Sequence, residues 1–251
     1  MAEKVLQGKV ALIAGGGKNL GRLISTTLAA DGALIAVHYN SNASKASAEE
    51  TVREVKKAGS DAFAYQADLT KIPEMVRLFD ETVKHFGRLD IGVNTVGKVL
   101  KKPFLDTTEA EYDEMFAINS KVAYFFIQES AKRMHDGGKI ITIATSLLAA
   151  FTGLYSTYAG GKAPLEHFTR AAAKEFGPRG ISVNNVAPGP MDTPFFYPAE
   201  SPESIAYHKS SSMSGRLTEI EDIAPIVRFL VTDGGWITGQ TIFANGGYTT
   251  R

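Results

Sequence analysis

Residues 10–21 read Val-Ala-Leu-Ile-Ala-Gly-Gly-Gly-Lys-Asn-Leu-Gly, and this stretch decides the fold. An apolar run of strand length passes into a glycine-rich turn, and helical periodicity follows over residues 20–31. Glycines between a first strand and a first helix let backbone amides approach a pyrophosphate at the positive end of the helix, although glycines also simply make turns. The placement favours a dinucleotide site, with these candidate residues: Gly15, Gly17, Lys18, Asn19, Leu20 and Gly21.

The rest of the chain repeats this alternation of strand and helix. Apolar runs rich in β-branched residues predict seven strands, at 10–14, 33–38, 62–65, 91–94, 139–144, 181–186 and 241–243. Helical periodicity predicts helices at 20–31, 44–58, 73–86, 111–134, 158–176 and 220–230. Four glycines are expected to close helices in the left-handed conformation, namely Gly32, Gly59, Gly87 and Gly177. The alternation predicts an α/β fold with a parallel sheet covered on both faces, and residues 1–251 read as one domain.

Composition narrows the class of partner. The 27 basic and 27 acidic residues cancel, and no basic run marks a nucleic-acid or anionic lipid surface, so a small-molecule partner is expected. There is no cysteine, and the five histidines lack ligand spacing, so no metal site is predicted. No apolar stretch has the length of a secretory signal or a membrane span, and a cytoplasmic location is expected.

The residues at the end of the second predicted strand help to distinguish a site for NADP(H) from a site for NAD(H). NAD(H) sites usually place an acid about 20 residues past the glycines, whereas this chain has Tyr39, Asn40 and Ser41 there. These polar side chains and the charge of Lys18 suit a ribose phosphate, which an acid would repel. The sequence therefore favours NADP(H) over NAD(H), unless Lys18 is only a solvated loop charge.

Tyr158 and Lys162 lie four residues apart and would share one face of a helix. A lysine ammonium one turn away is expected to lower the pKa of the phenol toward a usable acid and base. Two hydroxyl residues, Thr145 and Ser146, precede the pair. Alone, the pair could be an exposed tyrosine stacking on a lysine stem. Together with the glycine turn, it indicates hydride-transfer chemistry on a nicotinamide cofactor.

These motifs, in this order, resemble the short-chain dehydrogenase/reductase family, and its NADPH-dependent carbonyl and 3-oxoacyl-carrier-protein reductases in particular. The resemblance covers residues 8–247 and implies a Rossmann-type, doubly wound sheet of seven strands, usually assembled as a tetramer or dimer. It also implies that Asp68 hydrogen-bonds the adenine, that Leu69 is one of the cofactor residues and that Thr193 holds the nicotinamide carboxamide. The remaining implied cofactor residues are Asn94, Thr95, Val96, Gly97, Pro188, Gly189 and Met191.

By the same resemblance, Asn119, Ser146, Tyr158 and Lys162 form the catalytic set. Tyr158 would give a proton to the carbonyl oxygen, and Ser146 would orient that oxygen. Lys162 would also grip the nicotinamide ribose. Asn119 would hold a water that resupplies the proton, although its side chain could instead bond to helix backbone.

Three departures from the family pattern carry expectations. Asn19 replaces the middle glycine, so the turn needs asparagine's tolerance of positive φ or a different path. Ser146 and Thr145 lie 12 and 13 positions before Tyr158, and Ser146 is preferred as the catalytic hydroxyl. Pro164 cannot make its helical amide bond, so a kink or loosened turn is expected beside the site.

The sequence says least about the residues that bind the substrate. Residues 188–215 contain five prolines and are expected to form a loop or lid. The candidate substrate residues are Thr145, Ser146, Leu147, Leu148, Tyr155, Tyr158, Phe195, Phe196 and Tyr197. Their aromatic and apolar character favours a ketone or secondary alcohol with a sizeable apolar or cyclic portion. Two alternatives are a cofactor-binding regulator or scaffold without turnover, and an enzyme acting on an activated carbon–carbon double bond.

Overall fold

The structure, a computed structural model, describes residues 4–250, and their strands form one parallel sheet. The strands are β1 (Val10–Ala14), β2 (Leu34–Tyr39), β3 (Ala62–Gln66), β4 (Ile91–Asn94), β5 (Lys139–Ile143), β6 (Ser182–Pro188) and β7 (Thr241–Ala244). They lie in the order β3-β2-β1-β4-β5-β6-β7, and every neighbouring pair is parallel. All seven strands agree with the sequence prediction to within two residues, and the α/β class is confirmed.

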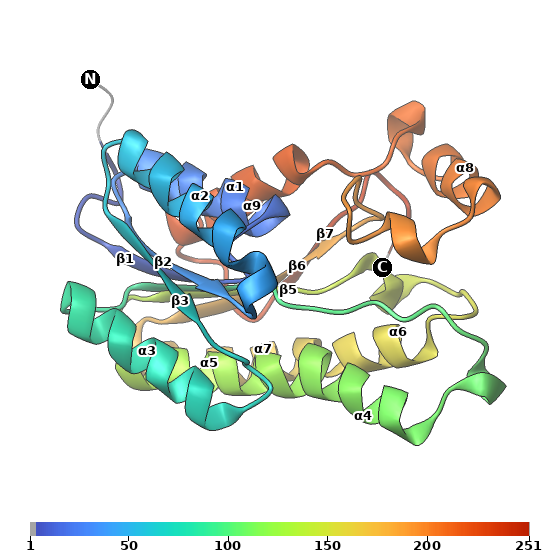
Figure 1. Cartoon of the computed structure of the whole chain (residues 1–251), viewed down its shortest axis with the longest axis horizontal. Coiled ribbons are helices and arrows are strands. Elements are labelled where there is room, and N and C mark those ends of the chain that lie inside the picture. Colours follow the sequence, from blue (N-terminus) through green and yellow to red (C-terminus); the bar gives the residue numbers. More distant parts are fainter. Residues whose placement is uncertain (1–3, 251) are drawn as a thin grey trace.

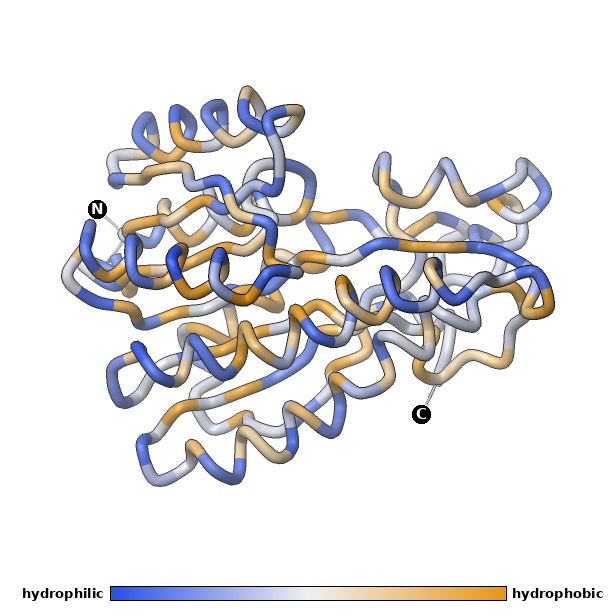
Figure 2. Tube along the Cα trace, turned by 60° about the horizontal axis from the view of Figure 1, so that its bottom comes forward, coloured by the Kyte–Doolittle hydropathy of each residue, from blue (hydrophilic) through white to orange (hydrophobic). Residues whose placement is uncertain are grey.

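Two layers of helices cover the sheet (Figure 1). One face carries α1 (Asn19–Ala30), α2 (Lys45–Lys57) and α9 (Ile220–Val231), and the other carries α3 (Ile72–Phe86), α5 (Val122–Arg133) and α7 (Pro164–Phe176). Each layer buries its own apolar cluster against the strands, around Leu28 on the first face and around Phe79 and Phe126 on the second. The apolar stripes of these helices turn inward, toward the sheet (Figure 2).

Two predicted long helices are interrupted beside the site. The expected helix over 111–134 begins earlier as α4 (Glu109–Phe116), passes through a π-helical turn at Ala117–Lys121 and continues as α5. The expected helix over 158–176 is divided into α6 (Ser156–Lys162) and α7, which begins at Pro164. Because proline has no amide hydrogen, the ladder of hydrogen bonds breaks there, and the expected loosened turn is confirmed.

Three of the four helix-closing glycines are confirmed. Gly32, Gly59 and Gly87 have φ values of 98°, 84° and 80°. The prediction for Gly177 is wrong, because its φ is −50° and the chain continues through a 3-10 turn at Gly177–Arg179. Gly180 takes the left-handed conformation instead, with φ of 66°.

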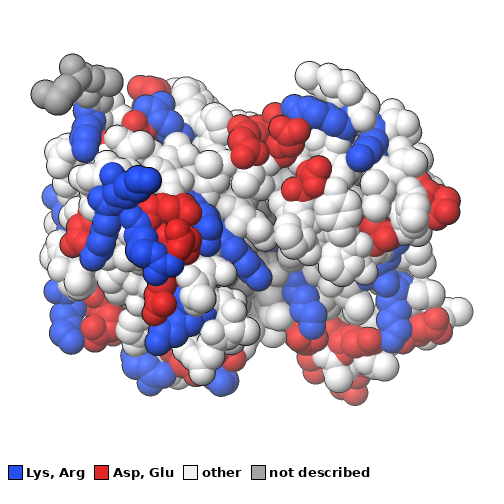
Figure 3. All heavy atoms as spheres, turned by 45° about the horizontal axis from the view of Figure 1, so that its top comes forward, with Lys and Arg blue, Asp and Glu red and all other residues white. Residues whose placement is uncertain are grey.

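The predicted lid is more ordered than a loop. It contains α8 (Pro202–Ser210), which begins with the Ser201 hydroxyl accepting from the amide of Ser204. This region projects beyond the carboxyl ends of the strands, on the same side as the C-terminus (Figure 1). Acidic and basic residues are interspersed on the face seen in Figure 3. Within residues 4–250, every helix is too short or too polar to cross a membrane.

Candidate active site

A cleft of about 610 Å³ opens at the carboxyl ends of the strands. It lies where the strand order reverses between β1 and β4, which is where ligands bind in doubly wound sheets. The structure brings most of the predicted residues to its walls. These are Gly15, Gly17, Lys18, Asn19, Leu20, Gly21, Tyr39, Asn40, Ser41, Asp68, Leu69, Thr95, Val96, Gly97, Thr145, Ser146, Leu147, Tyr155, Tyr158, Lys162, Pro188, Gly189, Met191, Thr193, Phe195 and Phe196.

The glycine turn leaves no room for side chains. A Cβ added to Gly21 would lie 2.1 Å from the carbonyl oxygen of Gly15, and one added to Gly15 would lie 2.5 Å from Oγ1 of Thr95. Asn19 has φ of 47°, so the expected use of asparagine's tolerance of positive φ is confirmed. Helix α1 starts there without a side-chain cap, and its first amides remain available to an anion.

Two side chains that the sequence analysis missed hold this turn. The amide of Gly15 donates to Nδ1 of His38 at 3.0 Å, and Nε2 of the same ring lies 2.8 Å from the carbonyl oxygen of Ala67. Complete burial lowers the pKa of His38 to about 4, so the ring is neutral and its proton is on Nε2. Arg22 donates to the carbonyl oxygens of Gly17 and Ser47. The contacts of His38 and the contact from Arg22 to Ser47 join residues more than 20 positions apart, which no local pattern shows.

The part of the cleft next to the end of β2 contains Lys18, Tyr39, Asn40 and Ser41, and no acid lies between residues 37 and 41. Asp68 follows β3 and is fixed in place, because its Oδ1 accepts from both the amide and the hydroxyl of Thr70, at 3.1 and 2.7 Å. These positions leave the end of β2 suited to an anionic group.

The nicotinamide end contains a buried polar atom without a partner. Oγ1 of Thr193 is buried and makes no hydrogen bond with any atom of residues 4–250, although Thr193 lines the cleft. A carboxamide from a nicotinamide ring would satisfy it, so the residues present fit a nicotinamide dinucleotide. Asn94 does not line the cleft. Its Oδ1 accepts from the amide of Val96 at 3.0 Å and shapes the turn after β4.

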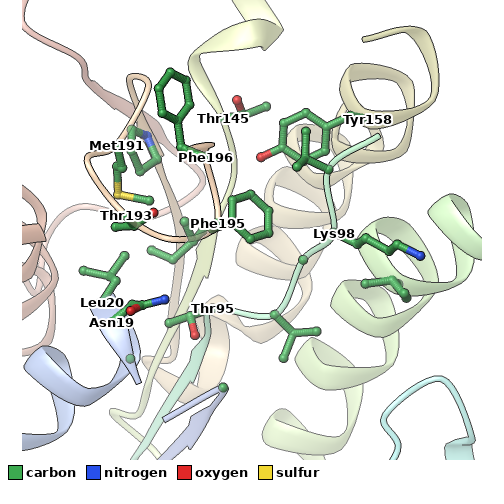
Figure 4. Close-up of a pocket in the computed structure, with 18 of the residues that line it drawn as sticks. Asn19, Leu20, Thr95, Lys98, Thr145, Tyr158, Met191, Thr193, Phe195 and Phe196 are labelled. Carbon is green, nitrogen blue, oxygen red and sulfur yellow. The ribbon is translucent and has the colours of Figure 1, made fainter. Parts of the chain in front are cut away.

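Tyr158 is paired with Thr145, whereas Ser146 was the expected partner. Thr145 lies beside the hydroxyl of Tyr158 (Figure 4), and a hydrogen bond with Thr145 lowers the pKa of the phenol. Ser146 points elsewhere, and its Oγ donates to the carbonyl oxygen of Ala187 at 3.3 Å. The reason is geometric: Thr145 is extended and immediately precedes a 3-10 turn at Ser146–Ala149, so consecutive side chains project in different directions.

The ionisation of the pair differs from expectation. Burial raises the pKa of Tyr158 to about 12, and only the hydrogen bond with Thr145 acts in the opposite direction. Burial also lowers the pKa of Lys162 to about 8. The Lys162 ammonium donates to the carbonyl oxygens of Ile143 and Val96, at 2.7 and 3.4 Å. The phenol is thus a proton donor over the whole neutral range.

Asn119 lies in the π-helical turn and does not line the cleft. Its Nδ2 donates to the carbonyl oxygens of Lys98 and Met115 at 2.9 and 3.0 Å, and its Oδ1 accepts from the amide of Lys98 at 3.1 Å. A Cβ on Gly97 would lie 3.2 Å from this Oδ1 and 3.3 Å from Nζ of Lys162. The amide therefore fixes the segment after β4 next to Lys162.

The segment over residues 188–215 contributes Phe195 and Phe196 to the wall of the cleft. Phe195 lies over Tyr158, with 6.5 Å between ring centroids. Two expected wall residues are elsewhere: Leu148 packs against a small apolar cluster, and the hydroxyl of Tyr197 donates to Asp192 at 2.6 Å. Cleft residues that the sequence analysis missed include Lys98, Glu114, Ile118, Glu200, His208 and Tyr248.

Comparison with known proteins agrees with this geometry. Residues 15–249 match the family model described as enoyl-(acyl carrier protein) reductase. A hydroxynaphthalene reductase-like protein from Metarhizium brunneum is 38% identical, over 98% of this chain and 96% of its own length. A Burkholderia cenocepacia protein described as a dehydrogenase, solved with bound NADP, is 58% identical with a TM-score of 0.96, covering 100% of this chain and 97% of that one. An angucycline C-6 ketoreductase with bound NADP is 33% identical with a TM-score of 0.90, covering 97% and 96%.

The glycine turn, the paired tyrosine and lysine and the seven-stranded sheet are thus found in one chain whose relatives match over nearly its whole length. The protein belongs to the short-chain dehydrogenase/reductase family and is an NAD(P)-dependent oxidoreductase that acts on CH–OH groups.

Proposed function

We propose that the protein is an NADPH-dependent reductase of ketones with a sizeable apolar or cyclic portion, reversible as a secondary alcohol dehydrogenase. The observation that carries the proposal is the pair of hydroxyls of Tyr158 and Thr145, at a cleft that also contains the glycine turn. A carbonyl oxygen placed between them would accept a hydrogen bond from Thr145 and a proton from Tyr158. When bound, the reduced nicotinamide supplies the hydride.

The chain's own residues set the direction of proton transfer. With a pKa of about 12, Tyr158 is protonated at neutral pH and is ready for carbonyl reduction rather than alcohol oxidation. Lys162 uses two carbonyl oxygens and retains a third N–H for a ribose hydroxyl. Asn119 acts here as a positioning residue, because it holds the Lys98 backbone that lies beside Lys162.

The preference for NADP(H) over NAD(H) is part of the proposal. Its support is the absence of an acid at the end of β2, together with Lys18, Asn40 and Ser41 at the same end of the cleft. Relatives solved with bound NADP agree with it. The substrate class is supported by the aromatic lid and by the names of the hydroxynaphthalene reductase-like and angucycline ketoreductase relatives.

We also propose that the chain forms a homo-oligomer, a tetramer or a dimer. Strand β7 is the outer strand of the sheet and is half-buried along its length. Phe229 on α9 is exposed, and Trp236, which follows α9, is 99% exposed. A second copy of the chain would cover these surfaces, and sedimentation equilibrium measures the number of subunits.

The first experiment titrates the purified protein with NADPH and with NADH, following nicotinamide fluorescence, and then adds cyclic and aryl ketones while the absorbance at 340 nm is recorded. We expect tighter binding of NADPH and oxidation that depends on the ketone. Enones of matched size form the second arm. If only their double bond were reduced, the ketone assignment would be wrong.

Tyr158→Phe separates an enzyme from a cofactor-binding scaffold. Loss of the proton donor should reduce kcat by about a thousandfold, within the usual range for general acids. NADPH binding should persist, because the phenol oxygen is all that is removed. Equal turnover by the variant and the wild type would refute the proposed role of Tyr158.

A further inference from the structure

The wall of the cleft includes a polar network centred on Glu200. Its carboxylate, with only 2% of the side chain exposed, accepts hydrogen bonds from the Tyr155 hydroxyl and from Nζ of Lys101 at 2.6 Å. Ser204 also donates to it, from the next turn of the lid. Glu200 and Tyr155 line the cleft, and Lys101 lies with its Nζ 5.4 Å from the Tyr155 ring centroid.

His208 extends this network to the C-terminal segment. Its Nε2 lies 3.3 Å from Oγ of Ser204 and 3.5 Å from Glu200, and its Nδ1 lies 3.0 Å from the hydroxyl of Tyr248. Because the Ser204 proton is directed to Glu200, Nε2 must be the donor toward Ser204. Burial lowers the pKa of His208, so the ring is neutral at pH 7 and Nδ1 accepts the proton of Tyr248.

The network therefore fixes the direction of two tyrosine protons. Tyr155 directs its proton to Glu200, and Tyr248 directs its proton to His208. Each phenol oxygen retains its lone pairs, and both residues line the cleft. The network is also coupled to Tyr158, because Tyr155 interacts electrostatically with both Glu200 and Tyr158.

We propose that Tyr155 and Tyr248 form a hydrogen-bond acceptor wall, held by Glu200 and His208, that selects ketones carrying a hydroxyl or another N–H or O–H donor away from the reacting carbonyl. The wall disfavours substrates with a carboxylate or phosphate at that position, because such groups find only lone pairs and a buried carboxylate there. This inference rests on the proposed function and specifies its substrate class.

The test uses bicyclic ketones that differ at one position. The wild type is assayed at pH 7 with NADPH on 1-tetralone and on its 5-, 6- and 7-hydroxy derivatives, each beside the corresponding methoxy derivative. We expect at least one hydroxy isomer to exceed its methoxy partner about tenfold in kcat/KM, the effect of one hydrogen bond. In the double variant Y155F/Y248F this ratio should fall to near one.

Tyr197→Phe is the matched control, because this lid tyrosine bonds to Asp192 and lies outside the cleft wall. It should keep the wild-type ratio. Glu200→Gln provides a second variant: Lys101 and Ser204 keep the one amide oxygen, so the amide nitrogen faces Tyr155 and cannot accept the proton of that tyrosine, which is released toward the cleft. It should reduce the preference for hydroxyl groups and improve kcat/KM for 1-tetralone-6-carboxylic acid.

Equal kcat/KM for every hydroxy and methoxy pair in the wild type would overturn the inference, as would a ratio unchanged in Y155F/Y248F. If the wild type reduces no tetralone, the proposed function fails for this class of ketone. The acceptor wall is then tested by calorimetry, which measures the Kd of each ketone. In that assay each pair is titrated into the protein saturated with NADP⁺. Tighter binding of a hydroxy isomer that Y155F/Y248F abolishes would support the wall, whereas equal Kd values would refute it.

Discussion

The two ends of the cleft are built on different principles. At the cofactor end, one contiguous turn over residues 15–21 meets the ends of β1, β2 and β4, and close approaches between backbone atoms determine its shape. At the substrate end, the wall consists of side chains from the segment after β4, the segment before α6, the lid and the C-terminal segment. Binding of a cofactor by backbone amides requires glycines at a fixed spacing in the sequence. A network of side chains, by contrast, can be assembled from residues far apart in the sequence.

The largest effect on NADPH binding should come from one methyl group added to the glycine turn. Gly21→Ala would place a Cβ 2.1 Å from the Gly15 carbonyl oxygen, which forces the turn apart. We expect NADPH affinity to fall at least a hundredfold in fluorescence titration. The same substitution at Gly153, before α6, meets nothing within 4 Å and should leave affinity unchanged. Equal NADPH affinity in the two variants would contradict the claim that close backbone approaches determine the cofactor end.

A smaller effect is expected where the two ends meet. Thr145→Val keeps the shape of the side chain and removes the hydroxyl bonded to Tyr158, so kcat should fall about a hundredfold. Ser146→Ala removes a hydroxyl that bonds to the carbonyl oxygen of Ala187, and its loss of kcat should stay below tenfold. The reverse order in steady-state kinetics would show that Ser146 is the catalytic hydroxyl after all.

The smallest effect concerns pH. Lys162 has a pKa of about 8, so its positive charge is complete at pH 7 and is lost as the pH rises above 8, whereas Tyr158 stays protonated up to about 12. Reduction should therefore be fastest near neutrality, and kcat/KM should decline about tenfold between pH 8 and 9.5. Circular dichroism over the same range checks that the chain remains folded. A level profile up to pH 10 would mean that the charge of Lys162 does not contribute.

Local pattern predicted the strands and the glycine turn because both depend on neighbours in sequence. Apolar runs of strand length report burial in a parallel sheet, and the positive φ of Asn19 is one of the two options that its place in the turn left open. The break at Pro164 was predicted for the same reason, because proline lacks the amide wherever it stands.

The features that the sequence did not predict depend on the direction of side chains or on contacts between residues far apart in the chain. Thr145 and Ser146 are adjacent, and only the 3-10 turn that follows decides which hydroxyl meets Tyr158. The raised pKa of Tyr158 reflects the burial of the phenol, which residue spacing does not report. The sequence did not indicate a role for Glu200, because that role depends on contacts with Lys101 and His208 that form only in the folded chain.

The hydrogen bond between Gly15 and His38 limits which backbone amides can bind a cofactor phosphate. The Gly15 amide is already engaged by the imidazole, and the Gly16 amide donates to the carbonyl oxygen of Ile13 at 3.1 Å. Neither can turn toward a phosphate, which leaves that role to amides nearer the start of α1. Two amides of the turn are therefore already bonded within the protein before any ligand arrives, so ordering them adds no entropy cost to association.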